Sequence, residues 1–150
     1  MLHLPKKMLY ALEAVVDIAF HARPDPVQSK EITQRQGIPQ RYLEQVMQQL
    51  VHAGILKGVR GPRGGYRLAR ERRRITAGDI VRVISDADNL EGGEQIFTSE
   101  IGQNVVAPLW ADAQNALLKQ LDQVTLEELC RNIEKTCGNS GPNNISDFNI

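Results

Sequence analysis

Two groups of long polar side chains in the first half of the chain could bind an extended polyanion. One group shares a face of a predicted helix and consists of Gln40, Arg41, Glu44 and Gln45. The other is Arg60 and Arg63, which belong to a turn with three glycines and one proline at residues 61–65. Arginine and glutamine can form paired hydrogen bonds with base edges in the major groove of DNA, and glutamate can accept one from cytosine. A slim cationic loop fits the narrow minor groove. These residue types therefore suit recognition of double-stranded DNA.

The segment from residue 29 to residue 70 must position both groups, and its pattern predicts a helix-turn-helix followed by a β-hairpin. Ser29 can cap the first helix, because a serine oxygen accepts a hydrogen bond from a free backbone N–H, and it is also a candidate DNA contact. Gly37 suits the left-handed conformation that ends a helix, and Pro39 suits the start of the next. The second helix, 40–52, has an apolar stripe at helical spacing: Leu43, Val46, Met47, Leu50 and Val51. Residues 55–60 and 66–69 are the predicted strands.

The neighbouring helices complete a fold that is mainly α with a small β-hairpin wing, and residues 1–85 form the winged helix-turn-helix domain. The first helix covers about residues 5–22, with this predicted core face: Met8, Leu12, Val15, Val16, Ala19 and Phe20. Lys6 and Lys7 at its start can meet DNA phosphates. Tyr42 and Arg67 are further phosphate contacts, which position a protein without specifying sequence. Thr76 and Asp79 have the spacing of a capping box for the next helix.

The charge of the chain is unevenly distributed, although the formal net charge is zero. Residues 1–82 carry fifteen Lys or Arg against seven Asp or Glu, and residues 83–150 carry three against eleven. The basic half contains the helix-turn-helix and the wing, which is the electrostatic footprint of a nucleic-acid partner. The alternative is a solvated surface whose charge asymmetry arose by chance.

The second half of the chain predicts a loop and then a long amphipathic helix. Residues 86–103 are acidic, contain a Gly-Gly pair and form the predicted sensor-region loop, with a short helical turn near Phe97. Residues 104–123 form the helix, whose apolar stripe is Val106, Leu109, Trp110, Ala113, Leu117 and Leu121. A stripe this long favours dimerisation, and ordinary core packing is the alternative. A last short helix follows up to residue 137, and residues 138–150 form a predicted disordered tail.

The two cysteines, Cys130 and Cys137, allow two interpretations. Cys130 shares an apolar stripe with Leu126, Leu129 and Ile133, which favours a buried structural thiol. A redox switch or an inter-subunit thiol site is the alternative. Residues seven apart on a helix are separated by about 10.5 Å, which exceeds the reach of a disulfide, so a bridge within this helix would require unwinding.

A family resemblance is carried by three segments: Tyr42-Leu43-Glu44-Gln45, Ala53-Gly54-Ile55-Leu56, and Arg60-Gly61-Pro62-Arg63-Gly64-Gly65-Tyr66-Arg67-Leu68. In this order they resemble the Rrf2 family of bacterial transcription regulators, and the resemblance covers nearly all of the chain except the tail. It implies a homodimer of winged-helix domains joined by a long helix. Several members sense iron–sulfur status, nitric oxide or cysteine metabolism.

The sequence departs from the cluster-binding members of that family. The resemblance implies three cysteines in the sensor region, where this chain has Gly92, Thr98 and Asn104, and Ala107 stands where some relatives carry a histidine. These residues cannot supply thiolates. We therefore expect no iron–sulfur cluster, no other cofactor and no metal.

Together these observations predict a homodimeric, sequence-specific transcription regulator, a repressor that binds a palindromic operator. The expected signal is redox, sulfur or iron status, or a metabolite. The alternative is a protein-interaction module, or a regulator controlled by a partner protein or a small ligand. We expect no enzyme activity, because no catalytic motif is present and the Gly61–Gly65 turn lies in a hairpin rather than before a helix. The chain also lacks an apolar run of about 20 residues and a secretory leader, so we expect a cytoplasmic protein without membrane contact.

Overall fold

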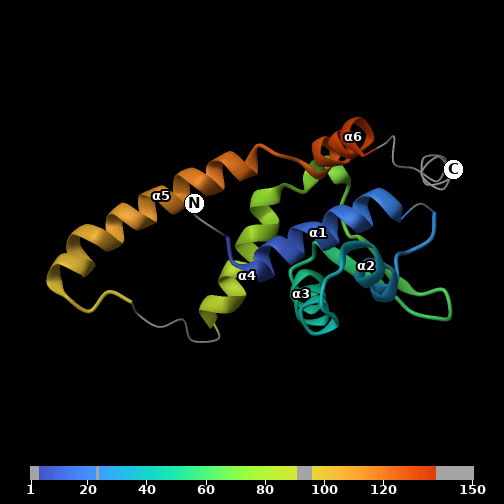
Figure 1. The fold of residues 1–150 in the computed structure, drawn as a ribbon, viewed down its shortest axis with the longest axis horizontal. Coiled ribbons are helices and arrows are strands. Elements are labelled where there is room, and N and C mark those ends of the chain that lie inside the picture. Colours follow the sequence, from blue (N-terminus) through green and yellow to red (C-terminus); the bar gives the residue numbers. More distant parts are fainter. Residues whose placement is uncertain (1–3, 23, 91–95, 138–150) are drawn as a thin grey trace, which may run out of the picture.

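A computed structural model describes residues 4–22, 24–90 and 96–137 (Figure 1). The helix-turn-helix region comprises α1 (Lys6–His21), α2 (Ser29–Gln36) and α3 (Gln40–His52). The antiparallel hairpin of β1 (Leu56–Val59) and β2 (Gly65–Leu68) follows, and then a 3-10 turn, η1 (Arg72–Arg74). The remaining elements are α4 (Ala77–Leu90), a π-helical turn η2 (Gly102–Val106), α5 (Ala107–Asp122) and α6 (Leu126–Thr136). The predicted fold class, mainly α with a two-stranded wing, is confirmed.

The core lies around α1, which contacts α2, α3, α4, α6 and β2. Because neighbours surround α1, the sequence prediction of its buried face is only partly right. The predicted Val15 is fully buried, together with Ala11, Ala14 and Ile18, whereas the predicted Met8 and Phe20 are half-buried at the edge of the core. Small alanine side chains let the neighbouring helices approach α1 closely, and this closeness does not follow from apolar periodicity alone.

The start of α2 differs from the predicted serine cap. Ser29 is the first residue of α2, and the residue that precedes the helix is Gln28. The Gln28 backbone N–H donates to the Glu31 carboxylate at 2.8 Å, so Glu31 takes over part of the capping role. The helix ends as predicted at Gly37, whose φ of 67° lies in the left-handed region that favours glycine.

The wing is a hairpin to which a third short segment is added. β1 and β2 pair in a register that places Leu56 opposite Leu68. Val27 forms a bridge with Tyr66, with hydrogen bonds in both directions at 2.9 and 2.7 Å. Gly64 lies so close to the Val59 carbonyl oxygen that a Cβ atom would collide with it. The wing is therefore joined to the chain segment that precedes α2.

The segment between the wing and the long helix is more helical than the sequence predicted. Thr76 and Asp79 form the predicted capping box, with hydrogen bonds of 3.0 and 3.1 Å. The helix that they start continues to Leu90, so the predicted loop from residue 86 begins later than expected. No helical turn is centred on Phe97, and instead the Gly102 N–H donates to the Ser99 hydroxyl at 3.0 Å next to the π-helical turn.

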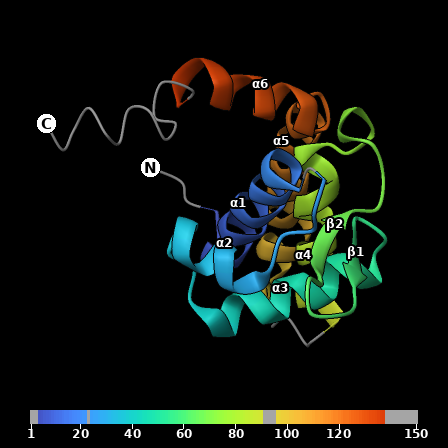
Figure 2. The ribbon, with the colours of Figure 1, turned by 90° about the vertical axis from the view of Figure 1, so that its right-hand side faces the viewer.

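The long helix α5 extends away from the rest of the molecule and is attached at its C-terminal end (Figure 1). Asp122, its last residue, forms a bidentate ion pair with Arg82 of α4, and this hydrogen-bonded contact lowers the pKa of the Asp122 carboxyl. The Leu126 N–H then donates to the Ile75 carbonyl oxygen at 2.9 Å. Thr125 caps α6 by accepting from the Glu128 N–H at 3.2 Å. The chain thus returns at α6 to pack against α1, a placement that Figure 2 also shows.

Candidate nucleic-acid interface

The second helix of the helix-turn-helix, α3, has one buried and one exposed face. Leu43, Val46, Met47 and Leu50 are almost completely buried, as the periodicity predicted. Val51 is the exception, with 37% of its surface exposed. The predicted base-reading residues all lie on the exposed face: Gln40, Arg41, Glu44 and Gln45. This face is long and polar, so it has the character of a helix that enters a major groove.

Several of these side chains are already held by neighbours in the absence of a ligand. The Gln40 amide donates to the Glu44 carboxylate at 3.1 Å, and its oxygen accepts from the Thr33 hydroxyl at 3.0 Å. The Arg41 guanidinium lies 5.0 Å from the centre of the Tyr42 ring, a cation–π arrangement. The Tyr42 ring packs in turn against Tyr10, with 5.6 Å between ring centres. These contacts restrict the side chains, which lowers the conformational entropy lost when they bind a ligand.

The wing tip presents two cations to solvent. Arg60 and Arg63 are exposed, and within the described ranges neither has a carboxylate at ion-pair distance. Gly61 allows the sharp turn between them with a φ of 114°. The turn is fixed by a hydrogen bond of 2.9 Å from the Gly64 N–H to the Gly61 carbonyl oxygen. Both arginines are thus carried on a short and ordered hairpin.

The residues predicted to contact phosphates differ in their exposure and in their partners within the fold. Lys6 is exposed at the start of α1 and stays a candidate. Lys7 forms an ion pair of 2.7 Å with Asp88 of α4, and only 13% of its side chain is exposed, so its charge is already neutralised within the fold. Arg67 is half-buried on β2 and lines a cleft on a different side from α3. Ser29 is half-buried, and its carbonyl oxygen accepts from the Thr33 hydroxyl at 3.0 Å.

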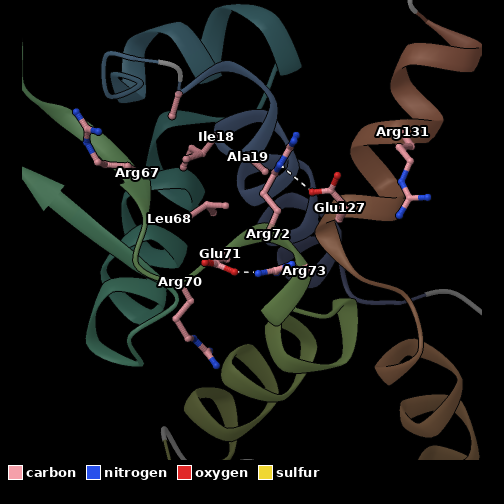
Figure 3. Close-up of a pocket in the computed structure, with 11 residues that line it drawn as sticks. Ile18, Ala19, Arg67, Leu68, Arg70, Glu71, Arg72, Arg73, Glu127 and Arg131 are labelled. Atoms are coloured by element: carbon pink, nitrogen blue, oxygen red, sulfur yellow. Dashed lines mark hydrogen bonds and ion pairs between the residues drawn. The ribbon is translucent and has the colours of Figure 1, made fainter.

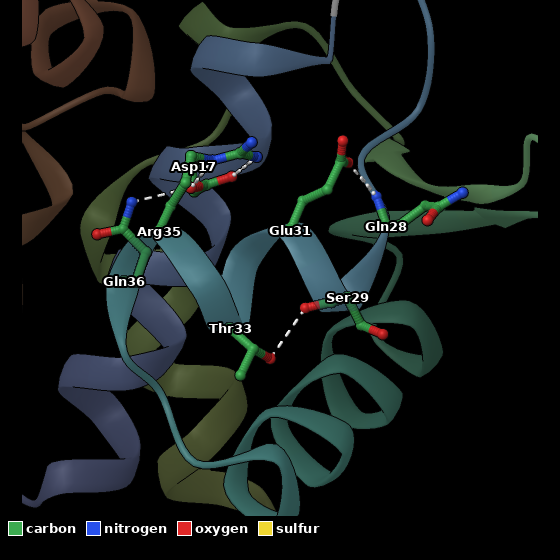
Figure 4. Close-up of polar contacts among 7 residues, drawn as sticks. All are labelled: Asp17, Gln28, Ser29, Glu31, Thr33, Arg35 and Gln36. Atoms are coloured by element: carbon green, nitrogen blue, oxygen red, sulfur yellow. Dashed lines mark hydrogen bonds and ion pairs between the residues drawn. The ribbon is translucent and has the colours of Figure 1, made fainter. Parts of the chain in front are cut away.

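A polar cluster that was not predicted from the sequence holds α2 against α1 (Figure 4). Asp17 is 97% buried and accepts two hydrogen bonds from the Arg35 guanidinium, at 2.9 and 2.8 Å. The Gln36 amide donates a third at 2.8 Å. The hydrogen bond to Asp17 raises the pKa of Arg35. An acidic residue within an otherwise apolar face of a helix is the signal that could have revealed this cluster.

The same cluster affects a neighbouring histidine. His21, the last residue of α1, has a pKa below its usual 6.5, because partial burial and the nearby Arg35 charge both disfavour the imidazolium. Asp17 and Glu31 act in the opposite direction, with a smaller effect. The pKa of His21 therefore depends on the charged residues at the contact between α1 and α2.

The predicted dimerisation stripe lies on the uncovered part of α5. Leu109 is 68% exposed, Trp110 is 47% exposed and Leu117 is 46% exposed. None of the residues of α5 is fully buried within the described chain. Core packing within one chain, the alternative interpretation, therefore does not explain the stripe. An apolar surface of this kind usually marks an interface.

The two thiols lie in different environments. Cys130 of α6 is 98% buried within the core, as the apolar stripe predicted, whereas Cys137 is exposed at the end of α6. They are not bonded to each other. Of the positions where the resemblance implies cysteines, Thr98 lies before the π-helical turn and Asn104 lies within it. Gly92 lies outside the described residues.

This donor set does not fit an iron–sulfur cluster, since four ligands, mostly thiolates, are needed. One thiol is buried in the core, and the other lies at the far end of α6 from the sensor region. Within the ranges 4–22, 24–90 and 96–137, no three His, Cys, Asp or Glu side chains are grouped to hold a metal ion. None of the helices in these ranges is long and apolar enough to cross a membrane.

Comparisons with known proteins give one consistent result. Residues 4–132 match the family described as "Rrf2: Iron-dependent Transcriptional regulator". An HTH-type transcriptional regulator, IscR of Xenorhabdus nematophila, is 32% identical over 142 residues, which cover 89% of this chain and 82% of that protein. Among solved structures, T. potens IscR superimposes with a TM-score of 0.70 at 37% identity and covers 89% of this chain and 90% of its own. The global cysteine regulator CymR of B. subtilis has a TM-score of 0.66 at 34% identity, with 87% and 98% covered.

Proposed function

We propose that this chain, which belongs to the Rrf2 family of DNA-binding transcriptional regulators, acts as a homodimeric repressor that binds a palindromic operator. The observation that carries the proposal is the combination of an exposed polar face on α3 with two exposed arginines at the wing tip, Arg60 and Arg63. In a dimer, two copies of α3 would enter successive major grooves, roughly 34 Å apart. The wings would reach the flanking minor grooves.

The roles of individual residues follow from their positions. Arg41 and Gln45 have the exposure and reach for base edges, while Gln40 and Glu44 hold each other and restrict their orientation. Arg63 is exposed in the turn between β1 and β2 and is the wing variant to test. Lys7 is removed from the proposed phosphate contacts because Asp88 already neutralises it.

DNA binding is tested by titrating the protein into a labelled duplex taken from the DNA upstream of its own gene. Fluorescence anisotropy monitors the binding at several salt concentrations. Arg63→Ala should weaken binding by roughly 1–3 kcal/mol, because a contact to a base or phosphate is lost. Arg74→Ala is the matched control, since Arg74 is also exposed but belongs to η1 and not to α3 or the wing tip. Equal affinities for the two variants would remove the wing from the interface.

The proposed dimer interface is the apolar stripe of α5. Leu109→Glu should convert the dimer to a monomer, because a charge would replace an exposed apolar side chain of the proposed interface. It should leave the thermal stability of the monomer nearly unchanged, since Leu109 is 68% exposed within one chain. Asn115→Glu is the control, because Asn115 lies on the opposite side of the same helix. Light scattering that gives a dimer mass for both variants would exclude this interface.

The signal is proposed to act without an iron–sulfur cluster, because the cysteine positions do not fit one. A thiol reaction at the exposed Cys137, a metabolite or a partner protein is the proposed input. The absorption spectrum and iron content of protein purified without oxygen test this directly. A coloured, iron-bearing protein would refute the proposal on the sensor and leave the proposal on DNA binding standing.

A second candidate function is suggested by the exposed apolar side chains around the start of α5, Ile101 and Val105, which are 70% and 61% exposed. They could bind another protein rather than a second copy of the chain. The salt dependence separates the two functions. DNA affinity falls steeply with salt in proportion to the phosphates neutralised, whereas apolar association does not. A weak salt dependence of the main interaction would favour the protein-interaction module.

A further inference from the structure

A cleft of about 720 Å³ lies between β2, η1, the end of α1 and α6 (Figure 3). Its apolar floor is formed by Ala22 and Leu68, which are half-buried, above the buried Ile18 and Ala19. Five arginines line it: Arg67, Arg70, Arg72, Arg73 and Arg131. Four of them lie within residues 67–73, and tertiary folding brings Arg131 of α6 to the same cleft. No residue of α3 and neither wing-tip arginine lines it.

The cleft carries an excess of positive charge. Among the described residues, Glu71 and Glu127 are the acidic ones that line it, so five guanidinium groups are accompanied by two carboxylates. Arg72 pairs with Glu127 at 3.3 Å and Arg73 pairs with Glu71 at 2.8 Å. In the part of the chain that the structure describes, the other three have no carboxylate at ion-pair distance. The local charge is therefore that of a site that attracts an anion with two or three negative groups.

The pair between Arg73 and Glu71 does not prevent Arg73 from binding such an anion. Its side chains are 74% and 61% exposed, so the pair is screened by water and contributes little to stability. Arg131 projects from α6 on the opposite wall, across from Arg73 (Figure 3). Arginine binds carboxylate and phosphate groups through paired hydrogen bonds. Two walls of the cleft can therefore each donate to a different anionic group of one molecule.

We propose that this arginine cleft binds an organic di- or trianion, whose carbon skeleton rests on the apolar floor and whose carboxylate or phosphate groups are held by Arg73 and Arg131. Such a ligand would join the base of the wing, through β2 and η1, to α6, which directly follows α5. Its occupancy would thus couple the wing to the long helix. The proposal goes beyond DNA binding, and its main test measures anion binding in the absence of DNA.

The test is calorimetric titration of the full chain with citrate and with pyrophosphate, at constant ionic strength because salt screens such interactions. Saturable binding of one anion per chain is expected for at least one probe. Arg73→Ala combined with Arg131→Ala should weaken it at least about tenfold, since two charge-assisted hydrogen-bonding groups are lost. Arg74→Ala, an exposed η1 residue outside the cleft, should leave the affinity unchanged.

Three results would overturn the proposal. One is the absence of saturable binding of both probes. Another is an equal loss of affinity in the Arg74→Ala control, which would indicate general charge screening. The last is a double variant that loses affinity for duplex DNA by the same factor as for the anion, which would make the cleft a contact to the DNA backbone. Citrate binding without pyrophosphate binding would support the proposal and define the ligand as a carboxylate.

Discussion

Replacing Arg35 by alanine tests how the helix-turn-helix is held in place. α2 has only eight residues, and a helix of this length is marginal on its own. Its attachment to α1 includes the two hydrogen bonds from Arg35 to the Asp17 carboxylate. Arg35→Ala removes both and leaves a carboxylate, whose side chain is 0% exposed, with Gln36 as its remaining hydrogen-bond donor.

The size of the effect can be worked from the burial of the two partners. Breaking a fully buried ion pair by removing one partner costs about 3–5 kcal/mol. The Arg35 side chain is 33% exposed and the Gln36 hydrogen bond persists, so the effective cost is lower. We expect a loss of roughly 2–3 kcal/mol in the free energy of unfolding, given this partial solvation. For a chain of this size that corresponds to a fall in Tm of roughly 4–12 °C.

Urea unfolding followed by circular dichroism measures this loss, with Lys30→Ala as the control. Lys30 is an exposed cation on the same short helix and has no ion pair within the described ranges. Adding Asp17→Asn to Arg35→Ala should recover part of the stability, because the isolated buried charge is then gone. An ordinary surface substitution changes the free energy of unfolding by about 0.5 kcal/mol or less. If the free energies of unfolding of Arg35→Ala and Lys30→Ala differ by no more than this, the anchoring role of the pair is refuted.

Two further predictions concern the wing and the end of α1. Gly64→Ala should destabilise the fold by about 1–3 kcal/mol, as overpacking does, because the new Cβ would collide with the Val59 carbonyl oxygen. Gly58→Ala places its Cβ in open space and should be far milder, and similar urea midpoints for the two variants would contradict the hairpin geometry. NMR titration should give His21 a pKa below 6.5. The contribution of neutral His21 to the free energy of unfolding is thus present above pH 6.5 and is lost as the pH falls through the pKa of His21 in the folded protein. Arg35→Ala should raise the pKa of His21, and an unchanged value would show that the Arg35 charge does not act on it.

Local sequence patterns were sufficient for the parts of the fold that depend on neighbouring residues. Gly37 ends α2 in the left-handed conformation, and Thr76 and Thr125 cap the helices that follow them. The stripe on α3 separates its core face from its polar face, apart from Val51. These features were predictable because caps and helical periodicity involve residues only a few positions apart.

Contacts between distant residues were not predictable in this way. Asp17 and Arg35 are 18 positions apart, and Lys7 and Asp88 are 81 apart. The sequence showed a charged Lys7 at a helix start, which is compatible with a phosphate contact, but only the packing of α1 on α4 decides that Asp88 neutralises it. Apolar periodicity likewise could not tell that Ala11 and Ala14, rather than Met8, form the most buried face of α1.

The sequence by itself determined that this protein is a winged helix-turn-helix regulator, because the spacing of apolar, capping and turn residues encodes each element and its polar face. Tertiary structure alone decided which apolar stripes are covered. α5 and α6 both carry such a stripe, yet that of α6 packs against α1 while that of α5 stays exposed. Tertiary structure also brought Arg131 of α6 to the four arginines of residues 67–73 in one cleft. The physical reason is that burial and charge clustering depend on which elements meet in space, and this depends on the whole set of packed surfaces rather than on any local pattern.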